Sequence, residues 1–174
     1  MAEAVPAMPK LVRVVDTVNE YAGRTVSWTI AVMMLIQVME CILRYIFKSP
    51  TFWAWETNEQ IFIAMISLSG GYALLYNMHV RLDLVFSRLS KRTQIIVDIV
   101  LFPLVVLFLA VLVWAGGQMA AYSLRFGERS DSIFAPPLSP IKVTFEVGVV
   151  LLLLQAIAHF ARNIVTLKYG LKKA

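Results

Sequence analysis

Charged residues are scarce in this sequence. Of its 174 residues, 16% are Asp, Glu, Lys or Arg and 59% are hydrophobic, and the mean hydropathy is +0.73. A water-soluble domain has about 25% charged and about 45–50% apolar residues. A chain of this length cannot hide so much apolar surface from water, because a small domain leaves a large share of its surface exposed. The composition therefore indicates an integral membrane protein.

Cysteine is almost absent, and the motifs of common enzymes are missing. The single cysteine, Cys41, lies in an apolar stretch and has no second cysteine with which to form a disulfide or a zinc site. The sequence contains no glycine-rich phosphate loop, no nucleophile–base pair and no cluster of metal ligands. We therefore expect a protein that is not an enzyme and that has no catalytic residues, no cofactor and no metal.

The two histidines leave one cofactor alternative open. His79 and His159 lie at the ends of two different apolar stretches, on the same predicted side, where two imidazoles could ligate a haem axially. The chain would then be a haem- or quinone-type membrane anchor of a respiratory enzyme. We favour the simpler interpretation, in which each histidine is a polar group at the membrane interface.

Four long apolar stretches predict four transmembrane helices. They cover approximately residues 26–47, 58–77, 95–121 and 141–160, and about 20 residues suffice to cross a bilayer as a helix. Pro103 lies inside the third stretch and should kink it. The short connections predict an all-α, up-down bundle that forms a single membrane domain, residues 1–174.

Two amphipathic segments accompany these spans. In residues 10–22, apolar residues recur at helical spacing: Leu11, Val14, Val15, Val18 and Ala22. The other face of this helix carries polar residues, namely Lys10, Arg13, Asp16, Asn19 and Glu20. Residues 79–94 show a similar spacing within a basic stretch. Such segments typically form interfacial helices, although the first could equally dock on a partner subunit.

The distribution of basic residues predicts the orientation. Eleven of the 16 Lys and Arg residues precede the first span, lie between the second and third, or follow the fourth. Because short loops rich in Lys and Arg stay in the cytoplasm, both termini and the middle loop should be cytoplasmic. The connections around Trp53 and Pro136 should then lie on the outer side.

The first span carries three polar residues on one helix face. Gln37, Glu40 and Arg44 are spaced by three and four residues, and charged groups at membrane depth usually face protein or water. We favour a Glu40–Arg44 pair that packs against a neighbouring helix. Two alternatives are an inter-subunit contact and a proton- or cation-coupling role of Glu40 in a small homodimeric exporter. Arg44 argues against the last, because it stabilises the ionised carboxylate.

Several short motifs occur in a fixed order along the chain. They are Arg44-Tyr-Ile-Phe, Trp53-Ala-Trp-Glu56, Ser69-Gly70-Gly71, His79-Val-Arg81-Leu-Asp83, and Pro136-Pro-Leu-Ser-Pro-Ile with Gly148 after it. With these motifs and its four spans, the chain resembles the small membrane subunit (DctQ-like) of tripartite ATP-independent periplasmic (TRAP) transporters. The resemblance covers roughly residues 26–162.

The resemblance implies a subunit that does not itself carry substrate. In such systems of the bacterial inner membrane, a periplasmic solute-binding protein delivers an organic acid or similar solute to two membrane subunits. The large membrane subunit holds the substrate and sodium sites and moves. The small one is expected to be a fixed scaffold in this ion-coupled symport. The expected partners are therefore the large subunit, the binding protein and the lipid bilayer, with no nucleic acid.

The motifs also give hypotheses about individual residues. Trp53, Trp55 and Glu56 are expected to brace the outer rim of the bundle and to help dock the binding protein; the alternative is an aromatic belt at the headgroups. The motif His79, Arg81 and Asp83 is expected to fix the cytoplasmic turn and to contact the partner subunit.

Overall fold

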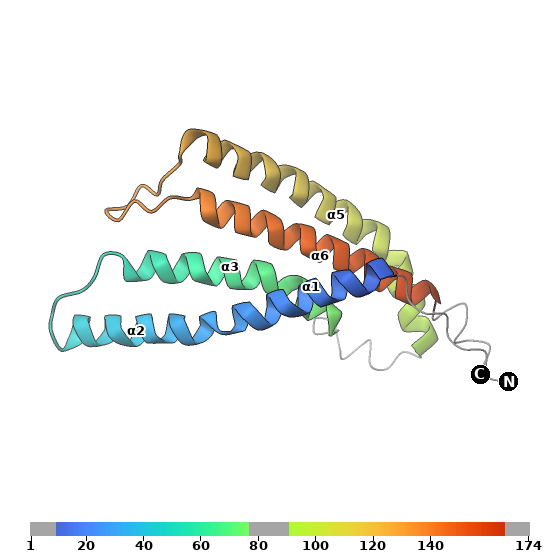
Figure 1. Ribbon diagram of the computed structural model, residues 1–174, viewed down its shortest axis with the longest axis horizontal. Coiled ribbons are helices and arrows are strands. Elements are labelled where there is room, and N and C mark those ends of the chain that lie inside the picture. Colours follow the sequence, from blue (N-terminus) through green and yellow to red (C-terminus); the bar gives the residue numbers. More distant parts are fainter. Residues whose placement is uncertain (1–9, 77–90, 166–174) are drawn as a thin grey trace.

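The computed structural model describes residues 10–76 and 91–165 (Figure 1). These residues form five α-helices, and the described part contains no β-strand. The helices are α1 (Lys10–Ser27), α2 (Thr29–Tyr45), α3 (Ala54–Leu75), α5 (Lys91–Phe126) and α6 (Ser139–Val165). The predicted all-α fold is confirmed.

Helix α6 lies at the centre of the bundle. It packs against α3 on one side and against α5 on the other. Helix α1 packs against both α3 and α6, and α2 packs against α3 and the end of α1. Figure 1 shows that α1 and α2 follow one another almost as a single rod, and that the helices converge at one end of the molecule. This end, with the start of α1 and the end of α6, is called the terminal end below.

The opposite end carries two connections, residues 46–53 and residues 127–138, and is called the loop end. The rings of Phe52 and Phe134 join the two connections, with centroids 6.2 Å apart. The connection that ends at Trp53 and the connection that contains Pro136 therefore lie on the same side of the bundle. The sequence predicted this arrangement from the alternating direction of the helices.

Three helical stretches of the described residues are long and apolar enough to cross a membrane. They are Lys10–Tyr45, Thr93–Phe126 and Ser139–Val165. Helix α3 has sufficient length, with 22 residues, but it is not among the three. Its first turns are polar and its middle contains serine and glycine, which lowers its apolar character. The predicted span at residues 58–77 thus forms a helix, and its crossing of the membrane stays a prediction.

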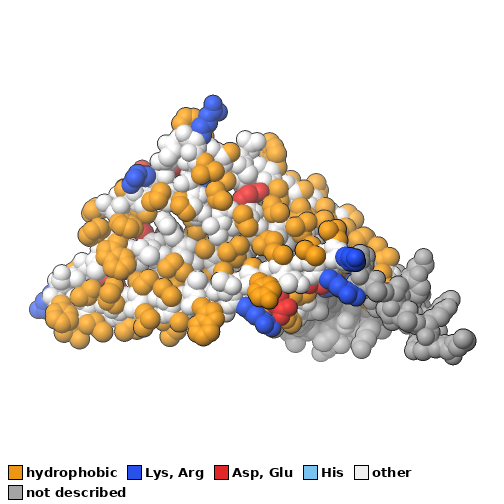
Figure 2. Space-filling view, viewed as in Figure 1, with side chains coloured by type: hydrophobic (Ala, Val, Ile, Leu, Met, Phe, Trp, Pro, Cys, Tyr) orange, Lys and Arg blue, Asp and Glu red, His pale blue; other side chains and the backbone are white. Residues whose placement is uncertain are grey.

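The surface of the bundle is apolar. Figure 2 shows hydrophobic side chains spread over the visible face, with Lys and Arg mainly at its edges. In α1, the residues Leu11 and Val14 are 75% and 58% exposed, whereas the polar Asn19 is fully buried. The amphipathic helix predicted at residues 10–22 therefore forms. Asp16, Asn19 and Glu20 of its polar face are turned toward the other helices, whereas Lys10 and Arg13 are exposed. The helix is also continuous with the first predicted span rather than separate from it, and its position relative to a membrane surface stays a prediction.

Small residues bring helices α3 and α6 into backbone contact. A Cβ atom added at Gly148 of α6 would lie 2.4 Å from the carbonyl oxygen of Ser67 in α3. A Cβ at Gly71 of α3 would lie 1.9 Å from Oδ1 of Asn19 in α1. Such small residues permit the close packing of helices in a membrane protein.

The connection between α5 and α6 is fixed by a glycine at the end of α5 and by a side-chain hydrogen bond to α6. Gly127, with φ of 60°, ends α5 in the left-handed conformation that favours glycine. The side chain of Lys142 in α6 then donates a hydrogen bond of 2.5 Å to Oε2 of Glu128. This hydrogen bond and the charge of Lys142 hold the pKa of the Glu128 carboxyl below its usual range, although partial burial acts in the opposite direction.

The backbone contact at Gly148 predicts a strong effect of a single methyl group. We expect Gly148→Ala to lower the free energy of unfolding by about 1–3 kcal/mol, because the new Cβ overlaps a backbone oxygen that cannot rotate away. The control is Gly70→Ala on the facing helix, where the nearest atom lies at an ordinary 3.7 Å. Thermal unfolding in detergent should separate the two variants, and equal stability would contradict the packing argument.

The Glu128–Lys142 contact predicts an acid-sensitive connection. Because the pKa of Glu128 is depressed in the folded state, its stabilisation is present above the ordinary carboxyl pKa near 4.5 and is lost as the pH falls below that value. The melting temperature should therefore drop more steeply on acidification for the wild type than for Glu128→Gln. Asp131→Asn, which changes an exposed acid in the same connection, should follow the wild-type curve.

Candidate functional site

Glu40 lies near the loop end of α2, where its carboxylate accepts four hydrogen bonds. Oε1 accepts from Nε and Nη2 of Arg44, at 3.2 and 2.7 Å. Oε2 accepts from the backbone N and the hydroxyl of Thr51, at 3.1 and 2.5 Å. The predicted Glu40–Arg44 pair is confirmed. The sequence did not reveal Thr51, which joins the connection after α2 to the helix through the same carboxylate.

Burial differs strongly between the two ends of this ion pair. The side chain of Glu40 is 7% exposed and that of Arg44 is 53% exposed. The carboxylate is thus inside the protein, while the guanidinium reaches outward along the helix, as expected for a long cationic side chain at an apolar surface. With all four acceptor positions of the carboxylate occupied, the pair acts as a brace between helix and connection.

Gln37 makes a different contact from the other two residues on its face. Its Oε1 accepts a hydrogen bond of 3.1 Å from Nδ2 of Asn58 in α3. The structure therefore divides the predicted polar face of α2 into two contacts. Glu40 and Arg44 hold the connection after α2, whereas Gln37 joins α2 to α3.

The tryptophan motif does not form one exposed patch. Trp55 is 75% exposed, whereas Trp53 and Glu56 are half-buried. Trp53 precedes the first residue of α3, and its carbonyl accepts a hydrogen bond from the backbone N of Thr57. The predicted roles of this motif in bracing the rim and docking a binding protein stay predictions.

The motif at His79, Arg81 and Asp83 lies outside the described residues, as does most of the amphipathic segment 79–94. The second histidine, His159, lies in α6 within the described part. Its Nδ1 is 3.3 Å from Nδ2 of Asn163, which also lies 3.4 Å from Oδ2 of Asp98 in α5. His159 is therefore one of several polar groups that join α5 and α6 near the terminal end.

A buried polar network at the terminal end was not identified from the sequence. Asn19 of α1 donates a hydrogen bond of 2.9 Å to Oε1 of Gln155 in α6, and both side chains are fully buried. The amide nitrogen of Gln155 donates to Oδ1 of Asp16 at 3.0 Å, and Oδ2 of Asp16 pairs with Arg162. We call these four residues the α1–α6 network.

One signal in the sequence pointed to this network. Gln155 interrupts the longest apolar run of the predicted fourth span. A lone amide at membrane depth requires a protein partner, because lipid offers neither donor nor acceptor. The polar face of residues 10–22 carries matching groups, but the sequence did not place that helix beside the fourth span.

The structure is thus a helical membrane protein, with an apolar exterior and with polar side chains paired between its helices. Over residues 33–166, the sequence matches the family described as tripartite ATP-independent periplasmic transporters, DctQ component. This match covers well over half of the 174 residues, and the chain therefore belongs to the DctQ family of TRAP transporter components. No protein of curated function matches the sequence.

Family membership confirms the resemblance drawn from the motifs. The members of this family are transporter components, which agrees at a general level with the expectation that the chain is not an enzyme. The matched range begins within α2 and extends to the end of α6, so that it includes the Glu40 contacts and Gln155. All of α1 precedes the matched range.

The α1–α6 network predicts a large effect from removing one buried partner. Gln155→Leu removes the acceptor that joins the Asn19 amide to α6, leaving it only the Val15 carbonyl of α1, and it also removes the donor to Asp16. We expect a loss of about 1–3 kcal/mol in the free energy of unfolding. The double variant Asn19→Leu, Gln155→Leu should recover part of this loss, because neither amide is then left unpaired. Thermal unfolding in detergent provides the measurement.

Gln118→Leu serves as the matched control, since Gln118 is an exposed amide of α5. That substitution should leave stability nearly unchanged. If Gln155→Leu were as mild as the control, the hydrogen bond between α1 and α6 would not hold the bundle together.

Proposed function

We propose that this chain is the small permease subunit of a TRAP-type transporter in the bacterial inner membrane. In this role it scaffolds the large membrane subunit during ion-coupled uptake of an organic acid or similar solute, which a periplasmic binding protein delivers. The observation that carries the proposal is the family match over residues 33–166. The internal contacts of the bundle support a static role.

A subunit that carries solute needs polar groups that change partners during transport. Here the intramembrane carboxylate of Glu40 is held by Arg44 and Thr51, from a helix and from a connection. A proton or cation taken up by Glu40 would have to replace these donors. This arrangement supports the scaffold and argues against an exporter that uses Glu40 as its coupling residue.

The lengths of the helices also suit a scaffold. The rod Lys10–Tyr45 and helix α5 each have 36 residues, or about 54 Å at 1.5 Å per residue. The hydrocarbon core is only about 30 Å thick, so these helices tilt or extend into the headgroup region. In either case the long helices offer a neighbouring subunit an extended contact surface, which keeps the small subunit from changing its tilt.

The proposed orientation places both termini in the cytoplasm. The ion pair between Asp16 and Arg162 holds the start of α1 and the end of α6 at one end of the bundle, and the basic residues of the sequence favour the cytoplasm for that end. The loop end, with Trp53, Trp55 and Glu56, then faces the periplasm and the binding protein. In the same proposal, His79, Arg81 and Asp83 fix the cytoplasmic turn and contact the large subunit.

Purification and transport together test the scaffold. The tagged chain, purified from its native membrane in mild detergent, should bring with it a large polytopic membrane protein. In proteoliposomes, the pair should take up solute only when the binding protein and an ion gradient are present. For Glu40→Gln we expect weaker assembly, and uptake per assembled complex that equals the wild-type value, because the residue braces the structure and does not couple transport.

Three results would contradict this proposal. A haem band with soluble redox subunits would indicate a respiratory anchor. A homodimer that transports alone would indicate the exporter. Assembled Glu40→Gln complexes without uptake would give Glu40 a coupling role.

A further inference from the structure

A groove of about 440 Å³ runs between α2 and α3 near the loop end. Its walls are formed by Met33 and Met34 of α2 and by Trp55 and Phe62 of α3. Large parts of these side chains are exposed: Met34 is 63% and Trp55 is 75% exposed. We call this feature the α2–α3 groove.

Three polar side chains also line the α2–α3 groove. Glu59 is exposed, and among the described residues it has neither an ion pair nor a hydrogen-bond partner. Gln37 is exposed, with its oxygen bound to Asn58. The side-chain oxygen of Asn58, Oδ1, is buried and accepts no hydrogen bond from the described residues. Lipid chains cannot satisfy such groups, so a groove of this composition favours protein over lipid.

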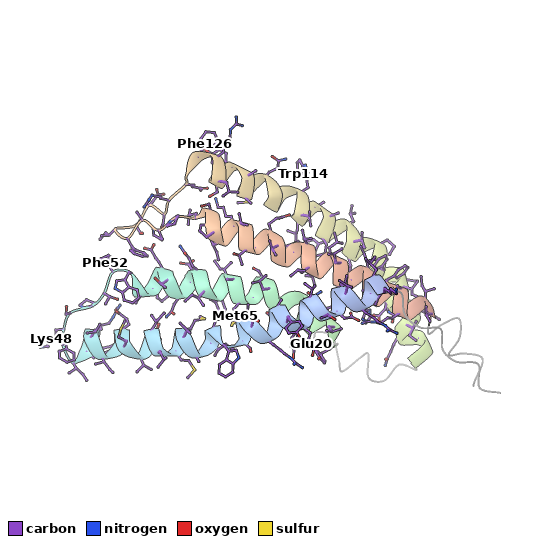
Figure 3. The ribbon with its side chains drawn as sticks, in the orientation of Figure 1. Glu20, Lys48, Phe52, Met65, Trp114 and Phe126 are labelled. Atoms are coloured by element: carbon purple, nitrogen blue, oxygen red, sulfur yellow. The ribbon has the colours of Figure 1, made fainter. Side chains whose placement is uncertain are left out.

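The outward side of α5 has the opposite character. Four exposed, large apolar residues share one face of this helix and do not line the cavity between α5 and α6: Val100, Leu107, Val111 and Trp114. Figure 3 shows the Trp114 side chain pointing away from the other helices. This surface offers lipid an apolar contact and contains no acid, which makes it the natural lipid-facing side of the bundle.

We propose that the α2–α3 groove receives a transmembrane helix of the large membrane subunit. This inference rests on the proposed function and names the surface through which it is carried out. The flexible methionine side chains adapt to an incoming apolar ridge, and an exposed tryptophan is a common anchor of a protein interface. The unpaired carboxylate of Glu59 requires a complementary group, so the docking helix carries a cationic or hydrogen-bond-donating side chain opposite it.

Photo-crosslinking in the assembled transporter tests the surface directly. A benzoyl-phenylalanine at position 34 or 62 is expected to form a covalent adduct with the large subunit in native membranes. The same probe at position 107 of α5, which is exposed at 63% as Met34 is, should give no adduct with that subunit. Mass spectrometry of the adducts identifies the partner.

Charge reversal tests the role of Glu59. Glu59→Lys should reduce the amount of large subunit that co-purifies by about tenfold or more, because it places like charges opposite one another. Asp131→Lys, at an exposed acid of the α5–α6 connection, should leave co-purification unchanged. The melting temperatures of the isolated variants should match that of the wild type, since neither acid has a partner among the described residues.

The possible outcomes separate this inference from the proposed function. If no large subunit accompanies the wild-type chain, both are wrong. If it accompanies the wild type but forms adducts only from position 107, the proposed function stands and the groove assignment is wrong. Adducts from position 34 to a second copy of this chain, or only to lipid, would also overturn the assignment.

Discussion

The hydrogen bond between Asn19 and Gln155 joins two helices that are far apart in the sequence, at a place that the surrounding solvent does not reach. Both amides are fully buried. Asn19 has a second acceptor in the Val15 carbonyl of α1, but the side-chain oxygen of Gln155 would lose its donor if α1 shifted along α6. In a lipid environment the separated helices have no solvent that could replace the lost contact. The register of α1, and through the continuous rod also the position of α2, therefore depends on this pair and on Asp16 and Arg162 beside it.

The same constraint explains why glycine is placed where the helices cross. A hydrogen bond as short as 2.9 Å between α1 and α6 requires close helix axes, and Gly71 of α3 leaves the space that Asn19 occupies. Gly148 gives α6 an equally close approach to the Ser67 carbonyl. In membrane helices this kind of packing replaces the hydrophobic effect, which does not act between lipid-exposed surfaces.

The sequence predicted the helices well and their inner faces poorly. Hydropathy located α2, α3, α5 and α6, and helical periodicity located α1. Helical spacing also predicted Glu40 with Arg44, because that contact is local. Thr51 and Asn58 were not predicted as partners, because they meet Glu40 and Gln37 only after the chain has turned. The polar face of residues 10–22 was recognised, but periodicity alone does not tell which face meets lipid. Only the packing of α1 on α6 turned Asn19 inward.

The outer surface follows from how the polar groups are distributed inside. Asn19, Gln155 and Glu40 form hydrogen bonds within the bundle. The apolar side of α5 therefore carries no polar group that requires a partner, and lipid can cover it. Glu59 has no such partner within the described chain, yet it lies on the rigid wall formed by α2 and α3. A bundle fixed by internal hydrogen bonds holds this carboxylate at a constant position. In the proposed scaffold role, a docked subunit would meet this acid at a fixed place, which makes Glu59 a more informative residue to test than the fully bonded Glu40.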